Sequence, residues 1–216
     1  MKTIPDRSID FVLSDPPYGI NYRSNQRTER FDHIANDRDT FPLIEAYLSE
    51  CQRILKDDTA IYLFCSWHHI DKFKPLFERF FTMKNLLVWN KNGHGMGDLQ
   101  GSYGPKHELI LFGHKGRSLN RGKRLHDVID CPKIGSTVMV HPTEKPVKLL
   151  TKLILNSSDE GDIVFDGFAG AGSTCIAANR LSRKFIGVEL DARYHATATE
   201  RVHGMFTSIG TTGMKV

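Results

Sequence analysis

The stretch from residue 162 to residue 189 constrains the fold of this chain more than any other part of its sequence. A short apolar run over 162–166 leads into Phe-Ala-Gly-Ala-Gly-Ser-Thr at 168–174, and residues 173–181 suit a helix. A second apolar run, 185–189, ends in an acid. Strand, glycine turn, helix and strand in succession are typical of an α/β protein with parallel strands.

The same alternation runs through the rest of the chain. Apolar runs predict strands at 9–13, 60–65, 86–90 and 108–112, and helical periodicity indicates helices from Pro42 to Leu55 and over 70–81, 146–156 and 192–202. Residues 113–140 have no clear period. We therefore predict an α/β fold with a mostly parallel, twisted sheet flanked by helices. The length of 216 residues, without a repeat or a linker, predicts a single domain over residues 1–216.

Composition excludes several classes of protein. With 40% hydrophobic and 25% charged residues, the chain is neither disordered nor a collagen-like repeat nor a disulfide scaffold. The four cysteines form no C-x-x-C pair, and the first residues form no apolar signal segment. No apolar run approaches the ~18 residues of a membrane span. We therefore expect a cytoplasmic protein without membrane segments, whose net charge of +4 permits a polyanionic partner without requiring one.

The glycine turn is the first candidate site. Gly170 and Gly172 allow backbone N–H groups at a helix start to approach a ligand closely. The turn is not a phosphate-binding P-loop, because Gly172 stands where a Lys is required, and Cys175 replaces the third glycine of a dinucleotide fingerprint. Glu189, at the end of the next strand, suits the hydroxyls of a ribose. The pair indicates a nucleoside-containing cofactor; the alternative is a turn used only for helix–strand packing.

The second candidate site is the sequence Asp15-Pro16-Pro17-Tyr18, which follows a predicted strand. The prolines fix the backbone and remove two N–H groups, leaving the Asp15 carboxylate and the Pro16 carbonyl as acceptors beside an aromatic ring. Two acceptors next to a ring suit a planar group that bears an NH2. The alternative is a plain turn, since Asp-Pro is common in turns.

A basic run is the third candidate, and it suits phosphate contact. It contains five cations and no acid: Lys115, Arg117, Arg121, Lys123 and Arg124. The alternative is a solvated loop. We expect no metal site, because Cys65 beside His68-His69 is better explained as a strand core residue, and His107-Glu108 lacks the spacing of the zinc deaminases.

In combination, these motifs resemble those of a known family. Asp15-Pro-Pro-Tyr18, a basic middle, His141-Pro-Thr-Glu-Lys-Pro146 and Phe168-x-Gly-x-Gly172 follow one another as in the site-specific DNA amino-methyltransferases of the permuted β group. The resemblance covers residues 5–201. It implies a Rossmann-like methyltransferase fold, S-adenosyl-L-methionine as the cofactor, double-stranded DNA as the partner, a bacterial or phage origin and a possible homodimer. A short basic segment at about 113–140 would contact the DNA. The target is the exocyclic amino group of adenine (N6) or cytosine (N4).

The resemblance also implies roles for individual residues. Asp15, Pro16, Pro17 and Tyr18 would form the catalytic loop, and Glu189 would take the ribose hydroxyls. The methionine and ribose parts of the cofactor would be held by Asp166, Phe168, Gly170, Gly172, Ser173 and Thr174, with Pro142, Thr143, Lys145 and Pro146 against the methionine moiety. Asp rather than Ser at position 15 favours adenine. Similar proteins carry a further strand with a Gly-Asp pair ahead of the segment that here begins at Met1, and that Asp helps to seat the cofactor's adenine.

The resemblance and the acceptor pair together suggest a mechanism. Asp15 and the Pro16 carbonyl accept the two amino hydrogens of a flipped-out base and free the nitrogen lone pair to attack the sulfonium methyl. Tyr18 stacks on that base, and the polar segment 21–39 closes over it. Other functions stay open at this point. They are cytosine N4 methylation, methylation of RNA or of a protein amide, and a catalytically weak DNA-binding homologue.

Overall fold

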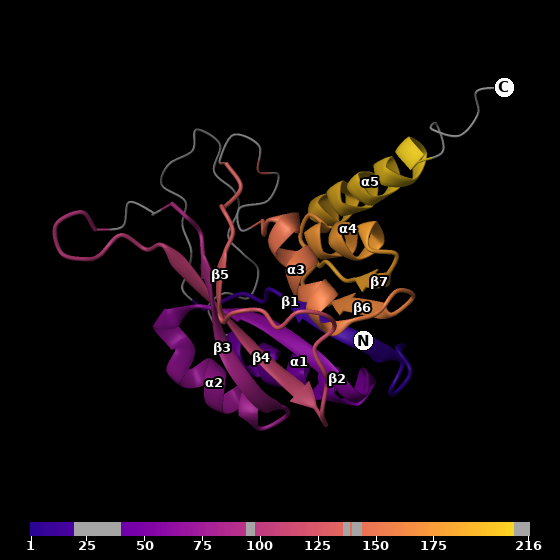
Figure 1. Ribbon diagram of the computed structural model, residues 1–216, viewed down its shortest axis with the longest axis horizontal. Coiled ribbons are helices and arrows are strands. Elements are labelled where there is room, and N and C mark those ends of the chain that lie inside the picture. The colour runs from indigo at the N-terminus through magenta and orange to yellow at the C-terminus, as the bar shows by residue number, and fades with distance from the viewer. Residues whose placement is uncertain (20–39, 94–97, 136–138, 140–143, 210–216) are drawn as a thin grey trace.

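In the described part of the chain, a seven-stranded sheet with helices on both faces forms the framework. The computed structural model describes residues 1–19, 40–93, 98–135, 139 and 144–209, with side chains as far as residue 204. Neighbouring strands are parallel except where β4 pairs antiparallel with β2 and β3 (Figure 1). The predicted α/β fold with a mostly parallel sheet is therefore confirmed.

Strands and helices alternate along the chain, with one stretch where three strands follow without a helix between them. The order across the sheet is β5-β3-β4-β2-β1-β6-β7. The strands are β1 (Ile9–Ser14), β2 (Leu55–Cys65), β3 (Thr82–Asn90), β4 (His107–Lys115), β5 (Val128–Asp130), β6 (Ile163–Asp166) and β7 (Lys184–Gly187). The helices are α1 (Thr40–Ile54), the 3-10 turn η1 (Trp67–His69), α2 (Ile70–Glu78), α3 (Val147–Ser157), α4 (Ser173–Arg180) and α5 (Ala192–Ile209).

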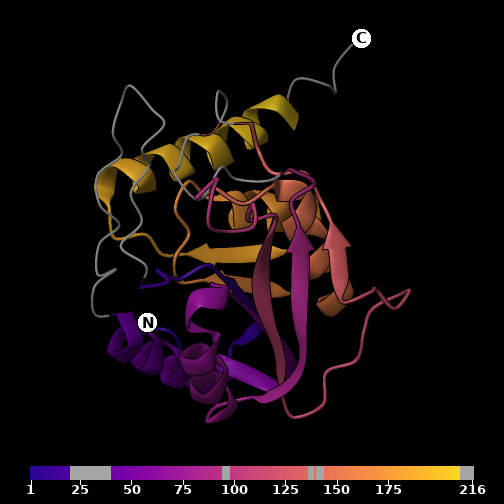
Figure 2. The same cartoon turned by 90° about the vertical axis from the view of Figure 1, so that its left-hand side faces the viewer.

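Side chains of the central strands alternate between two apolar cores. In β1, Phe11 and Leu13 belong to the core under α3 and α4, whereas Val12 belongs to the core under α1 and α2. Tyr62 and Phe64 of β2 lie in the first of these cores. Figure 2 shows the resulting layers, with the purple helices on one side of the sheet and the orange and yellow helices on the other. Because both faces are covered there, the buried parts of the central strands β1 and β2 are apolar runs in the sequence.

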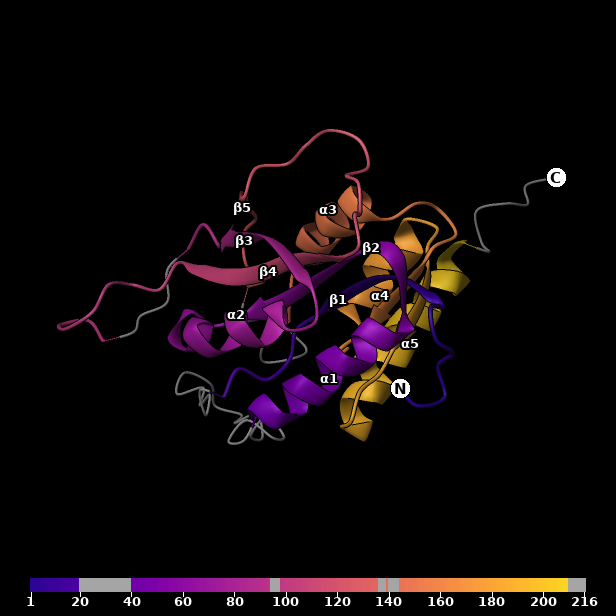
Figure 3. The same ribbon diagram turned by 90° about the horizontal axis from the view of Figure 1, so that it is seen from below.

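The chain changes direction across the sheet between β1 and β6, which are paired in parallel. From β1 the chain passes through α1 to β2 on one side, and from β6 it passes through α4 to β7 on the other. Both helices contribute to the apolar cores that contain the side chains of β1, and Figure 3 shows α1 and α4 together with this strand. A crevice at the carboxyl ends of two strands with diverging connections is the usual ligand site of such sheets. Asp15 and the glycine turn follow these two strands.

Several predicted boundaries differ from the structure. Strand β5 was not expected, because only Ile129 of its three residues is buried and so short a strand leaves no periodicity to detect. The predicted helix over 70–81 ends at Glu78, the predicted strand over 60–65 begins at Leu55, and the last helix extends to Ile209 rather than 202. No helix among the described residues is long and apolar enough to cross a membrane.

Candidate active site

The loop after β1 is held from two sides at the carboxyl edge of the sheet. It comprises residues 15–18, directly after the last residue of β1. Thr40, the first residue of α1, donates its hydroxyl to the Pro17 carbonyl at 2.8 Å. His69 Nδ1 donates to the Tyr18 carbonyl at 2.9 Å. Since the prolines also restrict the backbone, the carboxylate and the ring of this loop are presented in a fixed orientation.

The Asp15 carboxylate lies in a cluster of charged groups from four separate segments. Tyr18 donates its hydroxyl to Asp15 Oδ1 at 2.5 Å, and the Lys145 ammonium donates to Asp15 Oδ2 at 2.5 Å. Lys145 also lies 3.2 Å from Glu108 Oε2, and Lys91 donates to Glu108 Oε1 at 2.9 Å. Glu108 is here because β4 is antiparallel, so that its first residues lie at the carboxyl edge of the parallel strands.

Burial and charge oppose each other in this cluster. Burial raises the pKa of Asp15, although the adjacent Lys145 ammonium acts to lower it. Burial also acts to raise the pKa of Glu108, but the Lys145 and Lys91 ammonium groups outweigh it and hold this pKa below its ordinary value. Burial acts to lower the pKa of Lys145, yet the two carboxylates raise it above its ordinary value. Lys145 therefore remains an ammonium ion at neutral pH.

The glycine turn follows β6 and lies beside the end of β1. Ser14 Oγ, at the last position of β1, accepts the Gly167 N–H at 3.2 Å and so connects the two strand ends. Gly170 and Gly172 both adopt positive φ angles, 52° and 80°. A Cβ on Gly172 would also lie 3.0 Å from the Ala198 methyl group, so both backbone conformation and space require glycine there.

Glu189 stands two residues beyond β7 and faces the same turn. Its Oε2 accepts the Gly170 N–H at 2.8 Å, and its Oε1 accepts the Asp191 N–H at 2.9 Å. The side chains on either side of it are exposed: Val188 is 40% exposed and Leu190 is 77% exposed. A fixed carboxylate between exposed aliphatic side chains fits a ribose whose base lies against apolar surface.

Asp166, the last residue of β6, fits the amino-acid end of a nucleoside-containing cofactor, as Glu189 fits its ribose. The side chain is buried and accepts the Phe168 N–H at 3.0 Å. Burial raises its pKa to about 6, opposed only in part by hydrogen bonds that include the Thr174 hydroxyl. No cation among the described residues forms an ion pair with it. A buried carboxylate without a cation suits the ammonium group of S-adenosyl-L-methionine, so the residues present fit the expected cofactor.

An ion pair between Arg201 and the buried Glu144 carboxylate lies against the turn. Arg201 of α5 donates to the Ala171 carbonyl and to Glu144 Oε1, at 2.6 and 2.7 Å. Glu144 Oε1 also accepts the Ser173 hydroxyl at 3.3 Å, and this carboxylate is almost fully buried. Residue 144 is thereby joined to the glycine turn and to the C-terminal helix.

Four residues of the site were missed in the sequence: Lys91, Glu108, Glu144 and Arg201. Glu144 lies inside the His141–Pro146 motif, and its place in that motif was a signal that could have identified it. Glu108 opens an apolar strand, but its place at the site depends on the antiparallel direction of that strand. Pro142 and Thr143 and the expected closing segment 21–39 lie outside the described residues.

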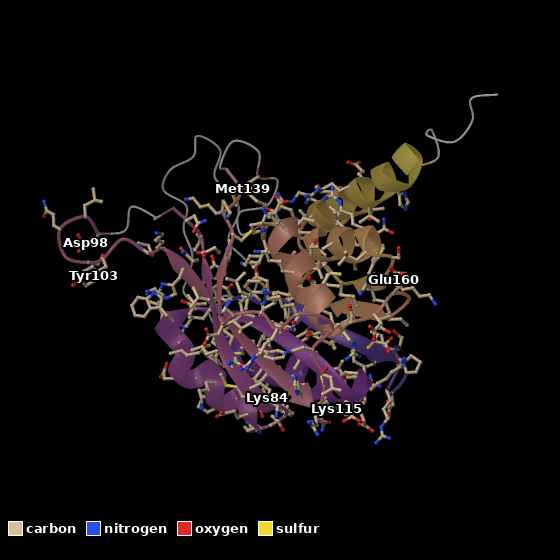
Figure 4. All side chains as sticks on the ribbon, in the orientation of Figure 1. Lys84, Asp98, Tyr103, Lys115, Met139 and Glu160 are labelled. Atoms are coloured by element: carbon tan, nitrogen blue, oxygen red, sulfur yellow. The ribbon has the colours of Figure 1, made fainter. Side chains whose placement is uncertain are left out.

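Most of the predicted DNA-contacting residues lie away from this edge. Lys115 donates to the Gln52 and Leu55 carbonyls at 2.8 and 2.6 Å, and Arg121 pairs with Asp159 at 2.7 Å. β4 is nine residues long and antiparallel, so its end lies roughly 26 Å from its start, at the opposite edge of the sheet. Figure 4 labels Lys115 there, far from Tyr103 in the arm that precedes the start of β4.

The remaining basic residues follow in the same loop. The Arg117 N–H is bonded to Asp58 at 2.8 Å, and Lys123 and Arg124 come later, in the segment that leads back to β5. Contact of this run with DNA stays a prediction.

An exposed aromatic ring does lie at the catalytic edge. Trp67 begins η1, directly beyond β2, and is 55% exposed. Its ring stacks on the His68 ring, with centroids 3.9 Å apart. His69, the last residue of η1, donates the hydrogen bond to the Tyr18 carbonyl described above.

Comparisons with known proteins agree with this geometry. Residues 9–200 match the family model described as DNA methylase. The putative methylase YubD of Escherichia coli (strain K12) is 36% identical over 204 residues, which cover 94% of this chain and 85% of the relative.

Solved structures show the same fold. The crystal structure of the M1.HpyAVI–SAM complex has a TM-score of 0.71 at 22% identity, covering 90% of this chain and 89% of that one. The PvuII DNA methyltransferase (cytosine-N4-specific) has a TM-score of 0.74 at 15% identity, covering 96% and 88%. The chain therefore belongs to the DNA methylase family, and it is an S-adenosyl-L-methionine-dependent enzyme that methylates amino groups of DNA bases.

Proposed function

We propose that this enzyme methylates the N6 amino group of adenine in double-stranded DNA, on a base that has left the helix. The observation that supports this best is the juxtaposition of Asp15 and the glycine turn at the ends of two adjacent parallel strands. One holds acceptors for an amino group, and the other fits the cofactor. Asp rather than Ser at the head of the loop favours adenine over cytosine.

The chain's own groups prepare the amino nitrogen for attack. An amino group conjugated to a purine is a poor nucleophile, because its lone pair is delocalised into the ring. Asp15 and the Pro16 carbonyl accept its two hydrogens and favour the pyramidal nitrogen, so that their stabilisation is greater in the transition state than in the ground state. When bound, S-adenosyl-L-methionine supplies the electrophilic methyl group. Asp15 takes the proton that leaves the methylated nitrogen and passes it to solvent.

Access to the nitrogen requires that the base leave the duplex, at a cost of a few kcal/mol. Two aromatic side chains at the edge suit a role in this step. The Tyr18 ring lies beside the acceptors, and Trp67 is exposed directly beyond β2. Stacking of a base on such a ring contributes roughly 1–3 kcal/mol.

Asp15→Ala tests the proposal. This variant removes one acceptor but leaves the glycine turn, Glu189 and Asp166 in place, so we expect methyl transfer to be lost while calorimetry shows unchanged cofactor binding. Nucleosides from treated duplex DNA, separated by mass spectrometry, report N6-methyladenine or N4-methylcytosine. N4-methylcytosine from the wild type would refute the choice of base, and full turnover by the variant would refute the role of Asp15.

A further inference from the structure

The Tyr18 hydroxyl and the Lys145 ammonium both contact the Asp15 carboxylate. Both also lie close to a second acceptor, the Glu108 carboxylate. The Tyr18 hydroxyl lies 2.5 Å from Asp15 Oδ1 and 3.3 Å from Glu108 Oε2. The Lys145 ammonium lies 2.5 Å from Asp15 Oδ2 and 3.2 Å from the same Glu108 oxygen. Glu108 Oε1 is bonded to Lys91, which fixes the orientation of the carboxylate.

In this arrangement Asp15 is poorly prepared to receive an amino group. One of its oxygens is taken by a hydroxyl and the other by an ammonium ion, and the ammonium is the stronger donor. A base amino group must compete with both for the lone pairs. The competition is relieved if the two donors have another acceptor at hand, because a buried donor without a partner is costly.

We propose that Glu108 is a positioning residue for methyl transfer, which accepts the Tyr18 hydroxyl and the Lys145 ammonium when the target amino group occupies Asp15. The inference rests on the proposed function and adds a residue to its machinery. Each donor needs to move only a few tenths of an ångström to reach a normal hydrogen-bond length to Glu108. With Lys91 the cluster holds two carboxylates and two ammonium groups, so the exchange changes no net charge.

Glu108→Gln removes the negative charge at nearly the same shape. We expect kcat on duplex DNA to fall about 100-fold, as for a misplaced catalytic group, with the cofactor Kd unchanged by calorimetry. Glu108→Asp keeps the charge and should restore part of kcat. Asp159→Asn, which removes an exposed carboxylate at the opposite edge, is the matched control and should behave as the wild type.

The pH dependence of kcat distinguishes this role from simple structural support. Asp15 is faced by Lys145, Glu108 and the Tyr18 hydroxyl, with Asp166 and Cys65 nearby. The Glu108 charge acts to raise the pKa of Asp15, so its removal lowers that pKa. The acid limb of the kcat profile should therefore move to lower pH in Glu108→Gln.

Several outcomes would overturn the inference. A Glu108→Gln enzyme with kcat within twofold of the wild type and an unmoved acid limb would do so, as would a loss confined to cofactor affinity. If the single variant does not fold, the charge-balanced Lys91→Met/Glu108→Gln variant is measured against the same criteria. A wild-type enzyme that methylates no DNA would instead refute the proposed function, and the role of Glu108 with it.

Discussion

Asp166→Asn should change both the pH dependence of stability and the affinity for the cofactor. Burial raises the pKa of this carboxyl from 3.8 to about 6. A carboxyl with a raised pKa in the folded state stabilises the fold fully below its unfolded pKa, and that stabilisation is lost as the pH rises through the folded value. One pKa unit corresponds to about 1.4 kcal/mol, so the full effect of this group is about 3 kcal/mol. Because pH 4 already lies slightly above the unfolded pKa, the cofactor-free wild type should lose about 2.5 kcal/mol of it between pH 4 and pH 7.

The asparagine variant has no charge to bury, so this loss should be absent. Urea unfolding of the cofactor-free protein at pH 4, 5, 6 and 7 measures the free energy of unfolding for both proteins. We expect the free energy of unfolding of the variant, minus that of the wild type, to rise by about 2.5 kcal/mol from pH 4 to pH 7. Since other carboxyls titrate in both proteins, this difference isolates Asp166. Asp159→Asn is measured in parallel as the control for loss of an exposed carboxylate.

The cofactor adds an independent readout. An ammonium group binds the ionised form of Asp166, so the affinity of the wild type for S-adenosyl-L-methionine should weaken as the pH falls through about 6. Without the carboxylate, binding should be weaker at pH 7 by about 1.5–3 kcal/mol, the contribution of a charged hydrogen bond. A variant with wild-type cofactor affinity and a parallel stability curve would refute the reasoning on both counts.

Two further predictions concern the turn and the exposed ring. Arg201→Met removes the guanidinium group that contacts the buried Glu144 carboxylate and the Ala171 carbonyl, so denaturant unfolding should show a loss of about 1.5–3 kcal/mol. Trp67→Ala removes the ring exposed at the catalytic edge, so fluorescence anisotropy of a labelled duplex should show binding weakened by about 1–3 kcal/mol, whereas cofactor binding should not change.

Each of these two variants is compared with a control substitution of the same residue type or at the same position. Arg193→Met, also in α5, breaks an exposed ion pair with Asp191, which directly precedes that helix, and should cost about 0–1 kcal/mol. An equal loss in both arginine variants would contradict the importance of burial. Trp67→Phe keeps an aromatic face and should retain most of the DNA affinity. Wild-type DNA affinity in Trp67→Ala would exclude the ring from the DNA contact.

Local sequence patterns are enough to predict the parts of this protein that depend on neighbouring residues. The run 162–189 predicts a strand, turn, helix and strand, and the structure forms them, with Gly170 and Glu189 hydrogen-bonded across the turn. Central strands such as β1 are detectable because they are covered on both faces, which requires consecutive apolar residues. The Asp15 loop is recognisable because its prolines act on their own backbone.

Which distant residues meet at the site depends on the packing of the whole fold. The charged cluster joins Asp15, Lys91, Glu108 and Lys145, and no local pattern relates positions so far apart. The antiparallel direction of β4 decided the rest, because it brings the strand's first residues to the catalytic edge and carries Lys115 to the opposite one. Strand direction follows from pairing and burial across the whole sheet, and these are long-range properties that periodicity within a segment does not contain.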